Sequence, residues 1–457
     1  MGTAKKTLIT DFTEGNVSKQ LLIFAAPLFL SNLLQIVYNM VDMIVVGQVL
    51  GSTGLSGVSV GGDVSGFLTF IAMGFSSAAQ VLISKHIGAG ERHKLGRFVG
   101  TMCTFLLSVA IVLSIICICL REPLLRLMNT PPEAFGEAMA YSTVCMAGMV
   151  FTYGYNMGSA ILRGMGDSKR PFVFISIAAV LNLILDLLFV IGFRWGARGA
   201  ALATVISQAV SFISCAGFIY KHRTYYEINV TARDFFHIDG EMLTELVKLG
   251  VPMAIKSAAV RFSKLFVNSW VNSYGVTVSA FAGIANKIST TSNQVSSAVN
   301  TAGSSMVGQN IGAKKYDRVK KVMVSIYKIT LLVAVVLSAL FIFFPESIYG
   351  IFTSEQAVIE LGVAYVPVVV LIFFGNTARS GMNALINGSG NTTVNFVTAI
   401  LDGIILRIGL GLLFGVALDM GYLGFFLGDA LAGFTPFFIG AVFYISGRWK
   451  TEGGRRK

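Results

Sequence analysis

Long apolar stretches separated by short polar segments follow one another along most of this 457-residue chain. A helix that crosses the hydrocarbon core of a membrane needs about 20 mostly apolar residues, and twelve stretches reach that length. Because the membrane interior holds no water to bond free backbone groups, each stretch is expected to be helical. The predicted spans are 18–47, 53–83, 96–120, 134–162, 169–193, 199–220, 243–273, 277–307, 320–344, 357–386, 393–417 and 421–447.

A long-period sequence repeat accompanies the spans. The tripeptide Ile-Gly-Ala at 87–89 returns at 311–313, each time before a basic stretch. Gly-Met-Gly-Asp at 164–167 returns as Gly-Ser-Gly-Asn at 388–391, with the same offset in the numbering. This period, close to half the chain, is far above that of solenoid repeats, which are tens of residues. In a hydrophobic chain, two related halves are typical of a transporter.

The repeat divides the chain into an N-terminal lobe at 1–222, a cytoplasmic linker at 223–242 and a C-terminal lobe at 243–457. Each lobe then holds six spans. An even number of spans gives both lobes the same orientation, so the repeat is parallel, about an axis along the membrane normal. The predicted fold is therefore an all-α integral membrane protein with twelve transmembrane helices in two six-helix lobes.

Composition and charge support the same assignment. Hydrophobic residues make up 54% of the chain and charged residues 13%, about half the share usual in soluble domains. The net charge of +12 comes mainly from Lys and Arg in the loops on one side of the predicted spans, as the positive-inside rule describes. We therefore expect a multi-pass membrane protein with both termini in the cytoplasm, and no binding to nucleic acid.

Polar residues inside the predicted spans of the first lobe are candidates for function, because ionisable groups are costly in lipid. Asn182 and Asp186 lie four residues apart on one helix face. From a rise of about 1.5 Å per residue, both should lie at a depth similar to that of Asp42 and Thr204. Such an oxygen-rich cluster can hold Na⁺, with Asp42 and Asp186 as ligands, or a proton. Asn156 is a further candidate member. The alternative is that these groups only bond neighbouring helices.

Residues beside this cluster are candidates for a substrate cavity. Gln35, Tyr38 and Asn39 precede Asp42 in the first span. From the second lobe we assign Lys264, which lies too deep in its span to reach the membrane surface comfortably.

The second lobe does not repeat the acids of the first. At an offset of 225, Asn182 corresponds to Arg407 and Thr204 to Asp429. We expect Arg407 and Asp429 to form a buried structural pair, with contact between Arg407 and substrate as the alternative.

Several kinds of chemistry are not indicated. The chain has no Gly-x-x-x-x-Gly-Lys-Ser/Thr motif for nucleotide phosphates, and all four histidines fall outside the predicted spans. The five cysteines match no metal-binding spacing. We therefore expect a non-enzyme without a tightly bound cofactor.

The first-lobe set and the repeated loops together resemble the multidrug and toxic compound extrusion (MATE) family. Asp42, Asn182, Asp186 and Thr204 match, in order and spacing, the cation site of its prokaryotic DinF-like branch. The resemblance covers nearly the whole chain. It implies an antiporter that exports organic, often cationic, compounds in exchange for Na⁺ or H⁺ by alternating access, with Asp42 as the switch. Its partners would be a small-molecule substrate and the lipid bilayer, and we expect a monomer.

One departure from the family pattern concerns the second lobe. Some branches carry a carboxylate pair on spans 7 and 8, where this chain has basic residues at 256, 261, 264 and 287. A flippase for an anionic lipid-linked precursor is therefore the alternative function. An intramembrane enzyme that uses Asp42 and Asp186 is a third interpretation, but two parallel lobes fit alternating access better.

Overall fold

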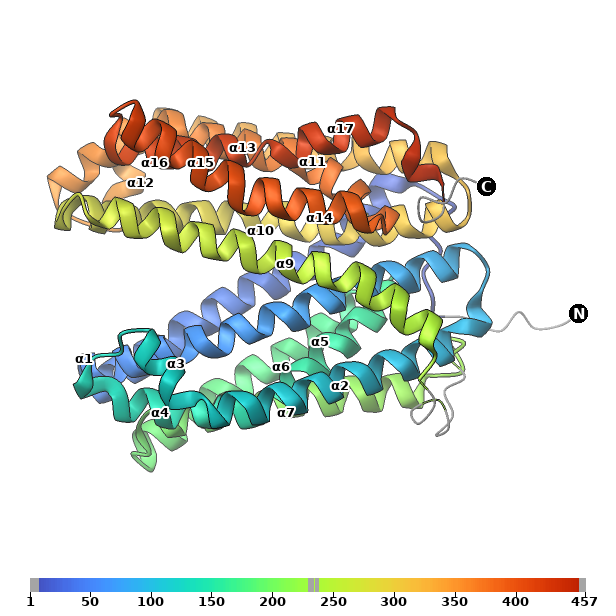
Figure 1. The fold of residues 1–457 in the computed structure, drawn as a ribbon, viewed down its shortest axis with the longest axis horizontal. Coiled ribbons are helices and arrows are strands. Elements are labelled where there is room, and N and C mark those ends of the chain that lie inside the picture. The colour runs from blue at the N-terminus through green and yellow to red at the C-terminus, as the bar shows by residue number, and fades with distance from the viewer. Residues whose placement is uncertain (1–7, 229–233, 235–237, 452–457) are drawn as a thin grey trace, which may run out of the picture. The chain divides into compact units, whose positions relative to one another are not determined.

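The computed structural model describes residues 8–228, 234 and 238–451, and within these residues the regular structure is entirely helical (Figure 1). The first part of the chain forms α1 (Val17–Gly88), η1 (Arg92–Lys94), α2 (Leu95–Cys119), α3 (Arg121–Leu127), α4 (Pro132–Ala147), α5 (Met149–Gly164), α6 (Lys169–Asp186), η2 (Leu187–Gly192) and α7 (Gly196–Lys221). The second part forms α9 (Gly240–Asn272), α10 (Val276–Gly312), α11 (Tyr316–Phe343), α12 (Pro345–Gly350), α13 (Gln356–Ser389), α14 (Thr392–Ile400), η3 (Leu401–Ile405), α15 (Leu406–Leu412), η4 (Leu413–Ala417), α16 (Gly421–Ala432), α17 (Thr435–Ile445) and η5 (Arg448–Lys450).

Helical structure occupies each of the twelve predicted spans. The first two spans lie in α1, which is two helices joined at Gly51, where the backbone leaves helical geometry with φ 64°. Within the described residues, eight helices are long and apolar enough to cross a membrane, and α4 with α5, bent by 49°, adds a ninth. The helices α9 and α10 are long enough but too polar to be counted with them. Many large apolar side chains are exposed on the apolar helices, as expected of surfaces that face lipid.

The chain packs into two compact units. Unit 1 comprises 1–11 and 30–254, and unit 2 comprises 12–29 and 255–457. These divisions differ from the predicted lobe boundaries, 1–222, 223–242 and 243–457, because the starts of α1 and α9 pack with a different unit from the rest of each helix. The predicted boundaries follow the sequence repeat, whereas the units follow packing.

Both helices that pass from one unit to the other do so two residues after a proline. Pro27 lies inside α1, and the division falls between Phe29 and Leu30. Pro252 lies inside α9, and the division falls after Ala254. Proline removes one backbone hydrogen bond from a helix and favours bending there. The divisions after Phe29 and after Ala254 are therefore 225 residues apart, as Pro27 and Pro252 are.

The repeated glycines make equivalent close contacts within each unit. A Cβ atom at Gly164 would lie 2.8 Å from the Cβ of Ile83, and one at Gly388 would lie 2.7 Å from the Cβ of Val307. Ile83 and Val307 are themselves separated by the period of the repeat. Only glycine allows backbones to approach this closely, which is how small residues act between membrane helices. The glycines therefore repeat because the helix packing repeats.

The last residue of the same repeated segment accepts a hydrogen bond from the first turn of the following helix in both units. Asp167 Oδ1 accepts a hydrogen bond from the backbone N–H of Arg170 at 3.3 Å. Asn391 Oδ1 accepts one from Val394 at 3.0 Å. Asp and Asn are preferred at helix starts because their side chains satisfy a free backbone N–H.

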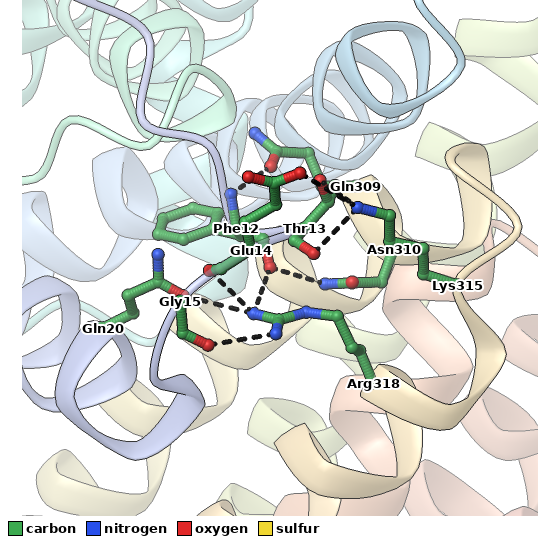
Figure 2. Close-up of polar contacts among 9 residues, drawn as sticks. All are labelled: Phe12, Thr13, Glu14, Gly15, Gln20, Gln309, Asn310, Lys315 and Arg318. Carbon is green, nitrogen blue, oxygen red and sulfur yellow. Dashed lines mark hydrogen bonds and ion pairs between the residues drawn. The ribbon is translucent and has the colours of Figure 1, made fainter.

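An extended segment before α1 is held on unit 2 by side chains of α10 and α11 (Figure 2). The backbone N–H of Phe12 donates to Gln309 Oε1 at 2.7 Å. The guanidinium of Arg318 donates to the carbonyl oxygens of Phe12 at 2.9 Å, Glu14 at 2.9 Å and Gly15 at 3.0 Å. This segment has no regular secondary structure, so these side chains replace the backbone partners that a helix would provide.

Candidate functional site

Three helices of unit 1 bring the predicted cation-site residues together. Asp42 comes from α1, Asn182 and Asp186 from α6, and Thr204 from α7. The exposed fractions of the side chains are small for the first three: 8% for Asp42 and 1% for both Asn182 and Asp186. The spacing of four residues on α6 places Asn182 and Asp186 on one face, one turn apart.

Asn182 links α6 to α7 through both ends of its amide. With the amide nitrogen placed toward Asp186, it donates to Asp186 Oδ2 at 2.8 Å. Its oxygen then accepts from the backbone N–H of Thr204 at 3.2 Å. The orientation follows from the hydrogen-bond network, since the opposite one places donor against donor and acceptor against acceptor. Asn182 therefore fixes the position of the Asp186 carboxyl group.

The carboxyl groups of Asp42 and Asp186 interact directly with each other. In each group the Oδ1 atom is buried and has no hydrogen-bond partner among the described residues. Two carboxylates in contact repel each other when both are ionised, so such a pair favours a shared proton or a bound cation. The unpaired oxygens fit that requirement, because buried polar atoms normally have partners.

Tyr38 and Gln35, which we predict to line a substrate cavity, lie beside this cluster. The hydroxyl groups of Tyr38 and Thr204 are 3.5 Å apart. A small cleft in unit 1 is lined by Leu34, Gln35, Tyr38, Ile175, Ala178, Ala179, Asn182, Ser207 and Gln208. The cleft is thus continuous with a residue of the cation cluster, Asn182.

Two residues of this cleft were missed by sequence reasoning. Ser207 Oγ and Gln208 Oε1 are buried and unpaired among the described residues. They follow Thr204 by three and four residues on α7, which places all three on one face of the helix. That spacing is the signal that could have identified them.

Two other candidates are not held in the cluster. The Asn156 amide donates to the carbonyl of Thr152, one turn earlier on its own helix, at 2.9 Å. Asn39 is exposed on α1. Neither makes a hydrogen bond to Asp42 or Asp186 in the described part of the chain, and their proposed roles stay predictions.

Asp186 is followed immediately by a π-helical segment, η2. At an offset of 225, the η2 segment corresponds to the π-helical segment η4 of unit 2. Unit 2 has a further π-helical segment, η3 (Leu401–Ile405), with no equivalent among the described residues of unit 1. Such segments widen the helix by bonding each residue to the fifth along, and they occur often at functional sites.

The predicted pair of Arg407 and Asp429 is present in unit 2 and has a third member. Arg407 Nη1 forms an ion pair with Asp429 Oδ1, and Nη2 donates to Asp402 Oδ1 at 2.9 Å. Asp402 is five residues before Arg407, a separation that η3 brings together and that an ordinary α-helix does not. The Arg407 side chain is 2% exposed, which leaves no face for a substrate and favours the structural role.

Lys264, assigned from sequence to the substrate cavity, also lies in unit 2, on α9. It is partly exposed. Among the described residues it has no hydrogen bond or ion pair.

A second cleft of unit 1 lies at the start of α2 and α9 and is lined by His86, His93, Lys94, Arg97, Asp239, Glu241, Met242 and Glu245. Hydrogen bonds from Lys94 and His86 lower the pKa of Glu91 at its edge. Asp239 Oδ1 accepts from the backbone N–H groups of Met242 and Glu241, which lowers the pKa of Asp239. These contacts explain Glu91 and Asp239 as residues that bond groups near the starts of α2 and α9. No group of three or more His, Cys, Asp or Glu suited to a metal ion occurs in the described ranges.

Comparison with known proteins agrees with this arrangement. The sequence model of the MatE family matches residues 27–188 and 252–433, two segments that begin at Pro27 and Pro252. The probable multidrug resistance protein YoeA of Bacillus subtilis is 30% identical over 383 residues, covering 82% of this chain and 83% of the relative. YpnP of the same organism, also called a probable multidrug resistance protein, is 28% identical over 440 residues, covering 96% and 97%.

Solved structures show the same fold. A MOP superfamily transporter from Pyrococcus furiosus aligns with a TM-score of 0.89 and 21% identity, covering 98% of this chain and 100% of that one. A multidrug resistance MATE family transporter in an outward-facing conformation aligns with a TM-score of 0.87 and 22% identity, covering 97% and 99%. None of these comparisons supports the alternative of a flippase. The family expected from the first-lobe residues is confirmed: the chain belongs to the MatE family of multi-pass membrane transporters.

Proposed function

We propose that this chain is a secondary antiporter that exports small organic compounds, often cationic, in exchange for Na⁺ or H⁺. The observation that carries the proposal is the contact between the buried Asp42 and Asp186 carboxyl groups, each with an unpaired oxygen among the described residues. A transporter that couples two fluxes needs a site whose state changes with the coupling ion. A pair that requires a cation between its members provides such a site.

We place the organic substrate in the same unit, beside the small cleft, which at about 10 Å³ has room for about one water and must widen to admit a substrate. Tyr38 connects the cleft to Thr204, and Asn182 belongs to both the cleft and the ion cluster. Binding of the coupling ion changes the charge beside the cleft, and this is how the ion would change substrate affinity. By linkage, the substrate must change the affinity for the ion by the same factor.

The wider setting follows from the family and from the charge distribution. We place the protein in the inner membrane with both termini in the cytoplasm, acting as a monomer, with Asp42 as the switch between outward-open and inward-open states. The apolar helices and the basic loops support this orientation.

The test is flux into proteoliposomes that contain the purified full chain. A Na⁺ or H⁺ gradient is imposed, and uptake or release of rhodamine 6G, an organic cation, is followed by fluorescence. We expect gradient-driven flux that is lost in Asp42→Asn. The matched control is Glu122→Gln, which removes a charge from an exposed pair with Arg126 and should leave the flux unchanged. Flux that ignores both gradients, or that survives in Asp42→Asn, would refute the coupling.

A further inference from the structure

Three cationic side chains of unit 2 lack a carboxylate partner among the described residues. Lys256 on α9 donates to the amide oxygen of Asn383 at 2.7 Å. Arg379 on α13 donates to the amide oxygens of Asn293 and Asn376, each at 2.6 Å. Lys264 makes no hydrogen bond or ion pair in the described part of the chain. The hydrogen-bond partners of Lys256 and Arg379 are therefore neutral amides.

The carboxylates that act on these cations are the two that pair with Arg407. Asp402 and Asp429 are the acidic residues that act electrostatically on Lys256, Lys264 and Arg379. Both already form ion pairs with Arg407. Arg407, Lys256, Lys264 and Arg379 are thus four cations for two carboxylates, and Arg261 adds a further positive charge near Lys264. Charge taken out of water needs compensation, and an uncompensated group is strongly unfavourable.

The three cations form one cluster. Lys256 bonds the amide of Asn383, which lies one turn after Arg379 on α13, so these two cations lie side by side. Lys264 is about two turns further along α9, roughly 12 Å along the axis, and Arg379 acts on it electrostatically. The helix is pressed against η3: Ser263 Oγ donates to the carbonyl of Gly403, and a Cβ at Gly403 would lie 2.7 Å from that of Ala259. This packing holds the lysines beside the Arg407 network.

The cations also have free donors that a ligand can reach. Both amide contacts of Arg379 use Nη2, so Nε and Nη1 make no hydrogen bond with a described residue. Lys256, Lys264 and Arg379 are all partly exposed, unlike Arg407. A planar guanidinium edge with nearby ammonium groups matches the geometry of a carboxylate or phosphate.

Folding alone does not explain these charges. At an offset of 225, Lys256 corresponds to Ser31 and Lys264 to Asn39, and Arg379 corresponds to Gly154. Unit 1 therefore builds the repeated fold without them. At the same offset, Asp42 corresponds to Val267 and Asp186 to Gly411, so unit 2 has no acidic residue at either position.

We propose that Lys256, Lys264 and Arg379 form a binding site in unit 2 for an oxyanion group, a carboxylate or a phosphate. The group belongs either to a soluble organic solute or to an anionic lipid headgroup. The site concerns ligand chemistry in unit 2 and does not rest on the antiport proposed from unit 1, so that either can fail alone.

The test uses the purified full chain in detergent and carboxyfluorescein as an anionic probe, followed by fluorescence anisotropy. We expect saturable binding that inorganic phosphate displaces. Lys264→Gln and Arg379→Gln should each weaken it roughly tenfold, the size expected for one charge-assisted hydrogen bond. Lys264→Arg should retain it. The control Lys287→Gln removes an exposed lysine of α10 that is outside the cluster and should change affinity less than about twofold.

Two further measurements are needed. One distinguishes loss of binding from loss of folding, and the other distinguishes a lipid headgroup from a soluble anion as the ligand. The midpoint of thermal unfolding in detergent, measured on the same variants, must stay close to the wild-type value in Lys264→Gln. A large fall would show that Lys264 supports the fold and would overturn the proposal for that residue. In nanodiscs, probe binding that phosphatidylglycerol suppresses but phosphatidylcholine does not assigns the site to a lipid headgroup. Probe binding retained in both assigns it to a soluble anion. Absence of saturable binding by the wild-type chain, or equal affinity in Lys264→Gln, overturns the site.

Discussion

Asn182 donates a hydrogen bond of 2.8 Å to Asp186 Oδ2, one turn later on α6, while its oxygen accepts from the backbone of α7. The amide thus sets the direction of a carboxyl group whose other oxygen has no hydrogen-bond partner among the described residues. Positioning of this kind matters for an ion site, because ligand geometry depends on residues behind the ligands.

Replacing Asn182 by Leu should impair ion coupling while leaving the fold intact. The Asp186 carboxyl loses a fixed donor, and a lost hydrogen bond to a charged group typically costs about 1.5–3 kcal/mol. We expect the Na⁺ concentration for half-maximal flux to rise about tenfold or more. If the coupling ion is H⁺, loss of the donor favours the protonated carboxyl, so the H⁺ concentration for half-maximal flux should fall. The control is Asn156→Leu, whose amide bonds only its own helix. Equal effects of the two changes would place Asn156 in the cluster.

The Arg407 network should dominate the stability of unit 2. Arg407→Gln removes the ion-pair partner of Asp402 and Asp429, and breaking a buried pair costs about 3–5 kcal/mol. Arg126→Gln, in the exposed pair with Glu122, should cost less than about 1 kcal/mol. Thermal unfolding in detergent measures both. A small effect at Arg407 would mean that water reaches the two carboxylates.

Adding a methyl group to two glycines of unit 2 should have opposite effects. At Gly388 the new Cβ would be 2.7 Å from the carbonyl oxygen of Ser304, so Gly388→Ala forces α10 and α13 apart, at about 1–3 kcal/mol. At Gly283, on α10, nothing lies within 4 Å. Gly283→Ala should stabilise by about 0.4–1 kcal/mol because alanine favours the helix. Unfolding midpoints that shift in the same direction would contradict the packing described for Gly388.

The start of α9 should make stability depend on pH. Hydrogen bonds from the backbone of Met242 and Glu241 hold the pKa of Asp239 below its usual value of 3.8. A carboxyl group with a lowered pKa stabilises the fold above the unfolded value and loses that contribution as pH falls through the folded value. Asp239→Ala should cost about 1 kcal/mol at pH 7.

The difference between the wild type and Asp239→Ala should therefore shrink below about pH 4, in unfolding experiments at a series of pH values. Asp239→Asn, which keeps a capping oxygen, should resemble the wild type at pH 7 and lack the pH dependence. A difference that stays constant with pH would show that Asp239 acts only through packing.

Arg318 should control exchange in the segment before α1. Its guanidinium bonds three backbone carbonyls there (Figure 2), so Arg318→Gln should increase hydrogen–deuterium exchange of peptides that contain Phe12. We expect roughly a tenfold faster exchange if more than one charged hydrogen bond is lost. Lys320→Gln, at an exposed position of the same helix, is the control. Unchanged exchange would mean that Gln309 holds the segment alone.

The helical membrane fold, the repeat and four residues of the first-lobe cluster, Asp42, Asn182, Asp186 and Thr204, could be predicted from the amino-acid sequence. The length of each apolar stretch and the recurrence of Gly164 as Gly388 are read directly from the order of residues in the chain. Asn182 and Asp186 were found together because a helix has a fixed period of about 3.6 residues. Asp42 was added by estimating depth along its span.

Most partners of the charged side chains in unit 2 could be found only from the packing of its helices. Asp402 reaches Arg407 through η3, an irregularity that the helical period does not predict. Ser207 and Gln208 became candidates only when the cleft beside Asn182 was visible. Lys256 and Arg379 found neutral partners on helices far away in sequence. Periodicity places residues on a face of one helix, but partners on other helices depend on packing, and a surplus of charge appears only when those partners are known.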